Sequence, residues 1–202
     1  MFTYIYMNTN LTKRQSEIIQ TAIRLIGEGG IQALTIKNLS ADIGITESAI
    51  YRHFINKTEV LSTLLDYLKS IIISHYDNVY KLNLSSIERI KKMITGQLKI
   101  FAENPPYAIV ILSDGLYKNE RALHNKIFEL MGNAKSIYIK IIEEGKIAGE
   151  IREDVTSEHI AFIIMGSVRL AINQWSLSDF SFDLQERGNV LFETLKTLIQ
   201  IS

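Results

Sequence analysis

The stretch TIKNLSADIGITESAIYRHFINK, residues 35–57, decides the fold of the N-terminal part of this chain. Its apolar spacing predicts two short helices, Ile36–Ile43 and Glu47–Phe54. Gly44 supplies the turn between them, because glycine adopts turn conformations at little steric cost. Thr35 and Thr46 are expected to cap the two helices. Two short helices around a tight turn, the second with a polar start, are what a helix-turn-helix DNA reader needs.

The second helix of such a unit offers small or polar residues to base edges, and neighbouring donors hold it on phosphates. The candidates at its N-terminal end are Thr46, Glu47, Ser48 and Ala49. The candidate backbone contacts are Tyr51, Arg52, His53 and Lys57, together with Thr35 and Lys37. Spacing alone leaves open a generic three-helix cap whose polar residues are simply solvated.

Composition narrows the class of protein. The 202 residues are 47% apolar and 22% charged, as in soluble globular proteins. The absence of cysteine excludes structural disulfides, thiolate chemistry and Cys-ligated zinc. The longest apolar run near the C-terminus, residues 160–172, is too short for a membrane span and contains Arg169. The N-terminus does not resemble a secretory signal. We therefore expect a cytoplasmic protein without a membrane partner.

The distribution of charge matters more than its sum. The formal net charge of the chain is zero. Residues 11–58 carry six basic and four acidic side chains, a net charge of +2. So small an excess predicts weak DNA binding by one copy and stronger binding by two copies side by side.

Helical periodicity dominates the rest of the chain, which predicts an all-α protein. The only prolines, Pro105 and Pro106, are adjacent, so helices elsewhere are uninterrupted. A turn is expected over Gly145–Asp154, with Ser157 capping the helix that follows. The other helices are expected over about Lys13–Glu28, Thr58–Val79, Ser86–Glu103, Tyr107–Leu112, Glu120–Glu144, Glu158–Trp175 and Leu184–Ile199.

The N-terminal region also resembles a known family. The order is a helix ending in glycine, Thr35, an apolar-patterned helix with Ala41, the triplet 44–46, the run Ile50-Tyr51-Arg52-His53-Phe54, and Lys57 before a long helix. This order, over about Lys13–Leu65, resembles the TetR family of bacterial transcriptional regulators.

The resemblance implies a three-helix DNA-binding domain at 11–57 and a helical ligand-binding and dimerisation domain at 58–202. The N-terminal sequence itself predicts a flexible tail at 1–10. The resemblance also implies a homodimer formed by the last two helices, and repression of a palindromic operator that a small effector relieves. Tyr51, His53 and Lys57 match phosphate-contact positions, and Thr35 and Lys37 match backbone-contact positions. The residues at 46–49 match positions that read bases or the flanking backbone.

Two residues depart from the family pattern. Glu47 lies where relatives often carry a basic or neutral residue. Its carboxylate could accept from a cytosine amino group or serve only as a first-turn helix charge. Ser48 replaces a common glycine, which changes how closely the backbone can approach DNA.

The C-terminal part is less specific. The helix Glu158–Trp175 is apolar on nearly every face, which predicts burial on most faces. A partner subunit on one side would satisfy this pattern, and so would an intrachain core. Arg169 could meet an anionic ligand, pair with a carboxylate or extend to solvent. Candidate effector-pocket residues, each of which could instead be ordinary core, are Tyr76, Phe101, Tyr107, His124, Phe128, Met131, Tyr138, Met165, Arg169 and Trp175.

Catalytic and metal motifs are absent from the sequence, which has no nucleophile elbow, phosphate-cradling glycine loop or HExxH. We therefore expect neither an enzyme nor a cofactor or metal site. The predicted function is a ligand-responsive transcriptional regulator, most simply a repressor. The alternative is a DNA-associated protein whose C-terminal domain binds a protein partner.

Overall fold

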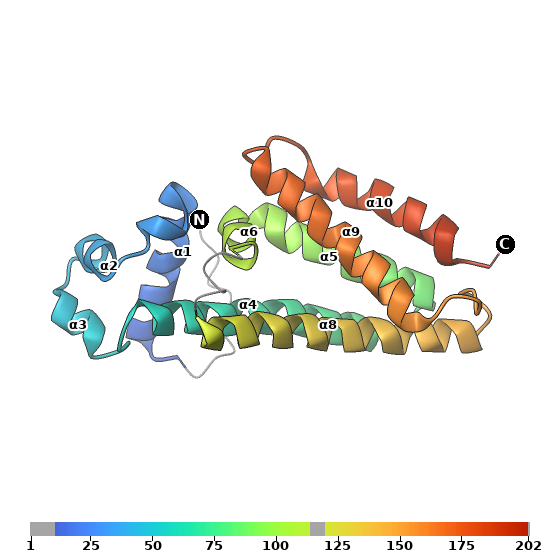
Figure 1. Cartoon of the computed structure of the whole chain (residues 1–202), viewed down its shortest axis with the longest axis horizontal. Coiled ribbons are helices and arrows are strands. Elements are labelled where there is room, and N and C mark those ends of the chain that lie inside the picture. Colours follow the sequence, from blue (N-terminus) through green and yellow to red (C-terminus); the bar gives the residue numbers. More distant parts are fainter. Residues whose placement is uncertain (1–10, 114–119, 202) are drawn as a thin grey trace. The chain divides into compact units, whose positions relative to one another are not determined.

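The computed structural model describes residues 11–113 and 120–201 (Figure 1). These residues form helices, with a single isolated bridge that pairs Ile151 with Gln200. The predicted tail at 1–10 lies outside the described residues. The helices are α1 (Lys13–Ala33), α2 (Ile36–Ile43), α3 (Glu47–Tyr51), α4 (Lys57–Tyr80), α5 (Ser86–Glu103), α6 (Pro105–Ile111), α8 (Arg121–Ile147), α9 (Ser157–Leu177) and α10 (Leu184–Ile199).

The described residues form two compact units. The first contains residues 11–71, 109–113 and 120–128, and the second contains 72–108 and 129–201. Three helices, α4, α6 and α8, contribute residues to both units. By compactness the first half of α4 belongs with the N-terminal helices, so the functional boundary expected at residue 57 remains a prediction.

The start of α1 follows directly from its sequence. Thr12 and Gln15 form a capping box, which satisfies free amides at the helix start. The buried face includes Ile18, Ile19 and Ile26. The regular part of the helix ends near Glu28, as predicted. Residues 29 and 30 leave helical geometry, Gly30 with φ of +71°, but a further helical turn continues to Ala33.

In the second unit, α5 packs against α10 and α9, and α9 packs against α10. Close approach depends on a glycine in α10. A Cβ placed on Gly188 would lie 2.4 Å from Cδ1 of Leu98 on α5. The buried residues Leu98, Phe192 and Leu195 belong to the resulting core.

The connection between α8 and α9 differs from the predicted turn. The helix α8 continues through Gly145 to Ile147. Gly145 lies inside the helix, and a small residue is required there because Ile151 packs closely against it. An added Cβ at Gly145 would lie 2.6 Å from Cδ1 of Ile151. The cap of α9 is Thr156, not Ser157: its hydroxyl accepts from the amide of His159 at 3.3 Å.

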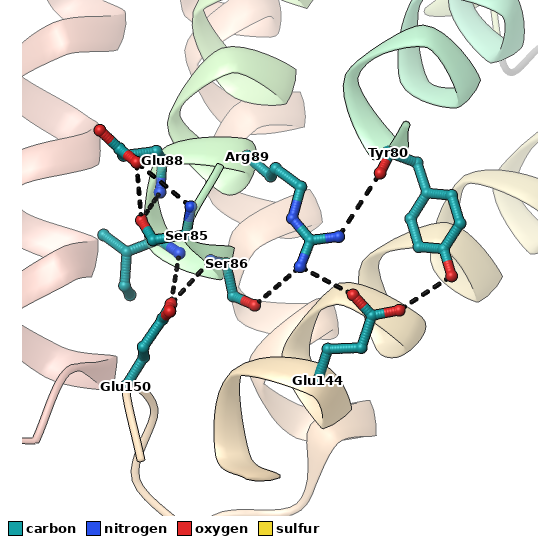
Figure 2. Close-up of polar contacts among 8 residues, drawn as sticks. Tyr80, Ser85, Ser86, Glu88, Arg89, Glu144 and Glu150 are labelled. Carbon is teal, nitrogen blue, oxygen red and sulfur yellow. Dashed lines mark hydrogen bonds and ion pairs between the residues drawn. The ribbon is translucent and has the colours of Figure 1, made fainter. Parts of the chain in front are cut away.

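A polar network joins α4, α5 and α8 within the second unit (Figure 2). Arg89 is 9% exposed, and its Nη2 lies 2.7 Å from Glu144 and 3.1 Å from the Ser86 hydroxyl. The Tyr80 hydroxyl donates to Glu144 at 2.8 Å. Glu150 accepts from the amide of Ser86 at 2.7 Å, at the positive end of the α5 dipole. These contacts hold together segments that are distant in sequence.

Among the described residues, α9 is the one helix long and apolar enough to cross a membrane. Core helices of soluble proteins meet the same criteria. Its buried residues, which include Ile160, Ile164 and Val168, belong to the core that α9 forms with α5 and α10.

Candidate nucleic-acid interface

The turn between α2 and α3 is built by local hydrogen bonds. Thr35 caps α2 by accepting from the amide of Asn38 at 3.0 Å. Gly44 ends α2 in the left-handed conformation, with φ of +76° and ψ of 35°. The amides of Gly44 and Ile45 both donate to the carbonyl of Ser40, at 3.0 and 2.9 Å. These bonds satisfy the end of α2 and reverse the chain within a few residues.

The helix α3 begins as the sequence predicts but ends earlier. Thr46 accepts from the amide of Ala49 at 3.3 Å, and Glu47 lies in the first turn. The helix ends at Tyr51 rather than Phe54. The amide of His53 bonds the carbonyl of Ile50 three residues back, which tightens the chain after Tyr51.

One face of this motif is anchored and the other is open. Ile50 and Phe54 are buried against the rest of the unit, at 0% and 2% exposure. Tyr51 is 52% exposed. The other exposed candidates are Lys37, Thr46, Glu47, Ser48 and Arg52, and the half-buried ones are Thr35, Ala49, His53 and Lys57. The predicted contact residues therefore occupy the surface of α2, α3 and the start of α4.

Lys57 is less available than a surface lysine. Its Nζ donates to the carbonyl of Ile31 at 3.4 Å, and desolvation by burial lowers its pKa. This contact ties the start of α4 to the last turn of α1. To bind a phosphate, the Lys57 ammonium group would have to share or break this intrachain bond.

Two further contacts position α2 and α3 and were not expected from the sequence. Arg24 on α1 pairs with Asp42 on α2 and also contacts Glu28 at 3.0 Å. The Gln15 amide group donates to the carbonyl of His53 at 3.4 Å. Both contacts join α1 to the motif, and no short-range pattern in the sequence indicates them.

The predicted effector-pocket residues divide into separate groups. Tyr76 and Tyr138 are buried, with ring centroids 5.4 Å apart in an edge arrangement. The Tyr76 hydroxyl donates to Gln97 at 2.5 Å, a polar residue that the sequence did not single out. The Tyr138 hydroxyl has no partner with hydrogen-bond geometry in the described residues. Burial raises the pKa of both phenols, and the neighbouring Tyr76 adds to the rise at Tyr138.

The other candidates differ in exposure. Phe101, Tyr107 and Trp175 are buried, and Trp175 meets the Phe180 ring at 4.6 Å. Met165 and Arg169 are half-buried. Three candidates on α8, His124, Phe128 and Met131, are exposed, and their place in an effector site remains a prediction.

A surface groove in the second unit is lined by a different set of residues, from α4, α5 and α10, and contains none of the ten candidates. The described part of the chain contains no group of His, Cys, Asp or Glu arranged to hold a metal ion.

Comparisons with known proteins identify the class. Residues 18–64 match the family described as bacterial regulatory proteins, tetR family, and residues 61–198 match the YsiA-like protein, C-terminal region. The chain therefore belongs to the TetR family of bacterial regulatory proteins, as its helix-turn-helix sequence predicted.

Relatives extend over nearly the whole chain. The nucleoid occlusion factor SlmA of Vibrio atlanticus is 25% identical over 196 residues, covering 95% of this chain and 98% of the relative. The fatty acid degradation regulator FadR from Bacillus halodurans has a TM-score of 0.84 at 20% identity, covering 93% and 97% of the two chains. FadR from Bacillus subtilis, in complex with stearoyl-CoA, has a TM-score of 0.78 at 24% identity, covering 89% and 96%. The solved structures share the fold of this chain.

Proposed function

We propose that this protein is a ligand-responsive regulator that binds a palindromic operator as a homodimer and is released by a small, mainly hydrophobic effector. The observation that carries the proposal is the capped α2–Gly44–α3 unit, whose exposed face collects polar and cationic side chains. Most members of such a family act by repression, so we propose repression here. A regulator of this kind acts on chromosomal DNA in the cytoplasm.

The proposed contacts follow the exposure of the side chains. Ser48 and Glu47, in the first turn of α3, are proposed to meet base edges. Tyr51 and Arg52, both exposed, are proposed to meet phosphates. Lys37 at the start of α2 would extend the backbone contacts.

The proposed dimer uses α9 and α10. Phe162 is 73% exposed, and Leu170 is also exposed, although both lie on a helix whose opposite face is core. Val190 and Leu198 are exposed in the same way on α10. Apolar side chains concentrated on two adjacent helices favour an interface between copies. Two copies would also double the small positive charge that each reading unit brings to DNA.

The proposed effector site is centred on Tyr138. The Tyr138 hydroxyl is buried beside the Tyr76 side chain and makes no hydrogen bond of good geometry within the described residues, so a bound polar group would complete its hydrogen bonding. Ile141, about one helical turn from Tyr138 on α8, is also buried. An amphiphilic effector with one polar group suits such a site. The stearoyl-CoA bound to FadR from Bacillus subtilis makes a long acyl thioester the first probe.

Selection of bound duplexes from a random DNA pool at near-physiological salt tests the function. We expect a palindrome whose half-sites lie about one helical turn apart, roughly 34–36 Å. Preference over a scrambled duplex should be roughly 10³-fold or more. Stearoyl-CoA should release the winning duplex from wild type and do so less effectively from Tyr138→Phe. Weak, salt-sensitive binding with no enriched motif would overturn the proposal.

A second candidate function has one specific observation in its favour. The relative from Vibrio atlanticus is a nucleoid occlusion factor and aligns with 95% of this chain. This second candidate is a DNA-associated protein whose C-terminal domain binds a protein partner while its N-terminal unit binds DNA. The His124 and Phe128 rings, stacked at 6.5 Å on the exposed side of α8, offer an apolar contact surface. Operator binding that no small molecule affects would favour this candidate.

A further inference from the structure

The groove between α4, α5 and α10 has the size of a small-molecule site. Its volume is about 480 Å³, within the usual range for ligand sites. All its lining residues belong to the second unit, and it opens to solvent. None of these lining residues is acidic, although two are lysines.

The two lysines face the same way. Lys92 and Lys99 are seven residues apart on α5, which places them on one side of the helix about two turns apart. Lys99 lies 3.8 Å from Glu103, but both side chains are mostly exposed, so the pair is weak. Within residues 11–113 and 120–201, Lys92 has no ion-pair partner. The groove therefore carries positive charge that the described chain leaves largely uncompensated.

The opposite wall adds neutral donors. Gln185 and Asn189 lie one turn apart on α10, and both line the groove. Each side-chain amide can donate two hydrogen bonds. Thr95 also lines the groove, but its hydroxyl donates to the carbonyl of Lys91 at 2.9 Å, so it offers lone pairs rather than a donor.

Part of the groove lining is aromatic or apolar. The His75 ring lies directly on α5, where a Cβ added to Gly96 would come within 2.2 Å of its Cε1. His75 Nε2 lies 3.1 Å from the carbonyl of Lys92, which favours a proton on Nε2 and fixes the ring. Val79 and Leu82 complete the apolar part, and Leu82 is 43% exposed.

We propose that this groove binds a small organic phosphate, with the phosphate on Lys92 and Lys99 and the apolar portion over His75, Val79 and Leu82. Lysines act on phosphate as compact point charges, whereas a planar carboxylate is better matched by the arginine fork, which this groove lacks. A phosphate dianion matches two cations. The groove shares no residue with the proposed Tyr138 site or with the predicted DNA contacts, so its occupancy would be a second chemical input to the proposed regulator.

The test uses the full-length protein and three small probes: phenyl phosphate, inorganic phosphate and phenol. Binding of each probe is measured from the NMR chemical shifts of the backbone amides. We expect phenyl phosphate to bind most tightly, because only it carries both the charge and the apolar portion. Shifts should concentrate at residues around Gly96 and Asn189. Lys92→Gln combined with Lys99→Gln should weaken phenyl phosphate about tenfold or more. The matched control is Lys135→Gln combined with Lys140→Gln, two lysines that are exposed on α8 outside the groove.

Circular dichroism and DNA affinity measured on the same variants show whether the fold and the reading function are intact, so the groove is tested independently of the proposed function. Equal weakening by the Lys135→Gln, Lys140→Gln double variant would show that only net charge matters and would overturn the proposal. If phenol bound as tightly as phenyl phosphate, the phosphate group would contribute nothing, and the proposal would be overturned. Vesicles containing phosphatidylglycerol distinguish a lipid source of phosphate from a soluble one. Shifts caused by an acidic peptide but not by phenyl phosphate would assign the groove to a protein and overturn the proposal.

Discussion

The guanidinium of Arg89 on α5 lies 2.7 Å from the carboxylate of Glu144 on α8 (Figure 2). Arg89 is nearly buried, whereas 43% of the Glu144 side chain is exposed. Glu144 is also held by the Tyr80 hydroxyl, and its pKa is lowered because hydrogen bonds from Tyr80 and Arg89 outweigh its desolvation. The Nε of Arg89 is buried without a partner in the described residues, so the guanidinium depends on the contacts that it keeps.

Glu144→Gln should therefore destabilise the second unit, because it removes the charge that offsets a buried cation. We expect a loss of about 1–2 kcal/mol, below that of a fully buried pair since water reaches Glu144. Adding Arg89→Met should recover part of the loss. Chemical denaturation measures both. Lys91→Gln, which breaks an exposed pair with Glu193, is the control and should cost under about 0.5 kcal/mol. Equal losses for test and control would contradict the role given to burial.

Gly44→Ala should destabilise the first unit by about 1 kcal/mol, because its φ of +76° disfavours any Cβ. An added Cβ would meet nothing within 4 Å, so the loss comes from the backbone alone. Gly44→Asn should cost less, since asparagine tolerates the left-handed region. Unfolding midpoints and DNA affinity should follow the order Gly, Asn, Ala. An asparagine variant as unstable as the alanine variant would show that backbone conformation is not the cause.

Arg52→Gln should weaken DNA binding on every sequence and lower the salt slope by about 1 for each phosphate that the side chain no longer neutralises. Lys57→Gln should do the same and also lower stability, because it removes the bond to the carbonyl of Ile31. Arg14→Gln is the control, since Arg14 is paired with Glu17 on the first turn of α1. Affinity measured across salt concentrations separates these effects. If Lys57→Gln changed stability and left the salt slope intact, Lys57 would be a structural tie and not a DNA contact.

Phe162→Glu should convert a dimer to monomers, because it places a charge on the exposed apolar face of α9. Phe128→Glu on α8 is a closely matched control, since the two phenylalanines are 73% and 72% exposed. Sedimentation measures the mass of each. A monomer from Phe128→Glu, with a dimer from Phe162→Glu, would move the interface from α9 and α10 to α8.

The stability of the second unit should fall as pH falls below about 6.5. Burial lowers the pKa of His75 from its ordinary value of 6.5, although the carbonyls of Lys92 and Met93 partly oppose this. The unfolded chain then binds the proton more readily than the folded one. Stability is present above pH 6.5 and is lost as pH falls through the folded pKa. His75→Gln should flatten this part of the denaturation profile; an unchanged slope would exclude His75 as its origin.

The sequence alone determined the helix-turn-helix and its family, because the signals that build this unit are local. Thr35 and Thr46 cap helices a few residues away, and Gly44 acts through its own φ. The predicted helix boundaries were accurate where a cap or a proline marks the end of the helix, as in Ser86–Glu103. They were less accurate where tertiary packing determines the local structure, as at Gly145.

Tertiary structure decided everything that joins distant segments. The exposure of Phe128 and the burial of Tyr138 come from one helix, and only its packing distinguishes a surface residue from a core residue. Lys92 and Asn189 are almost a hundred positions apart, yet they line one groove. A linear pattern records periodicity along one helix. It does not record which helices meet, and the sites of the second unit depend on that.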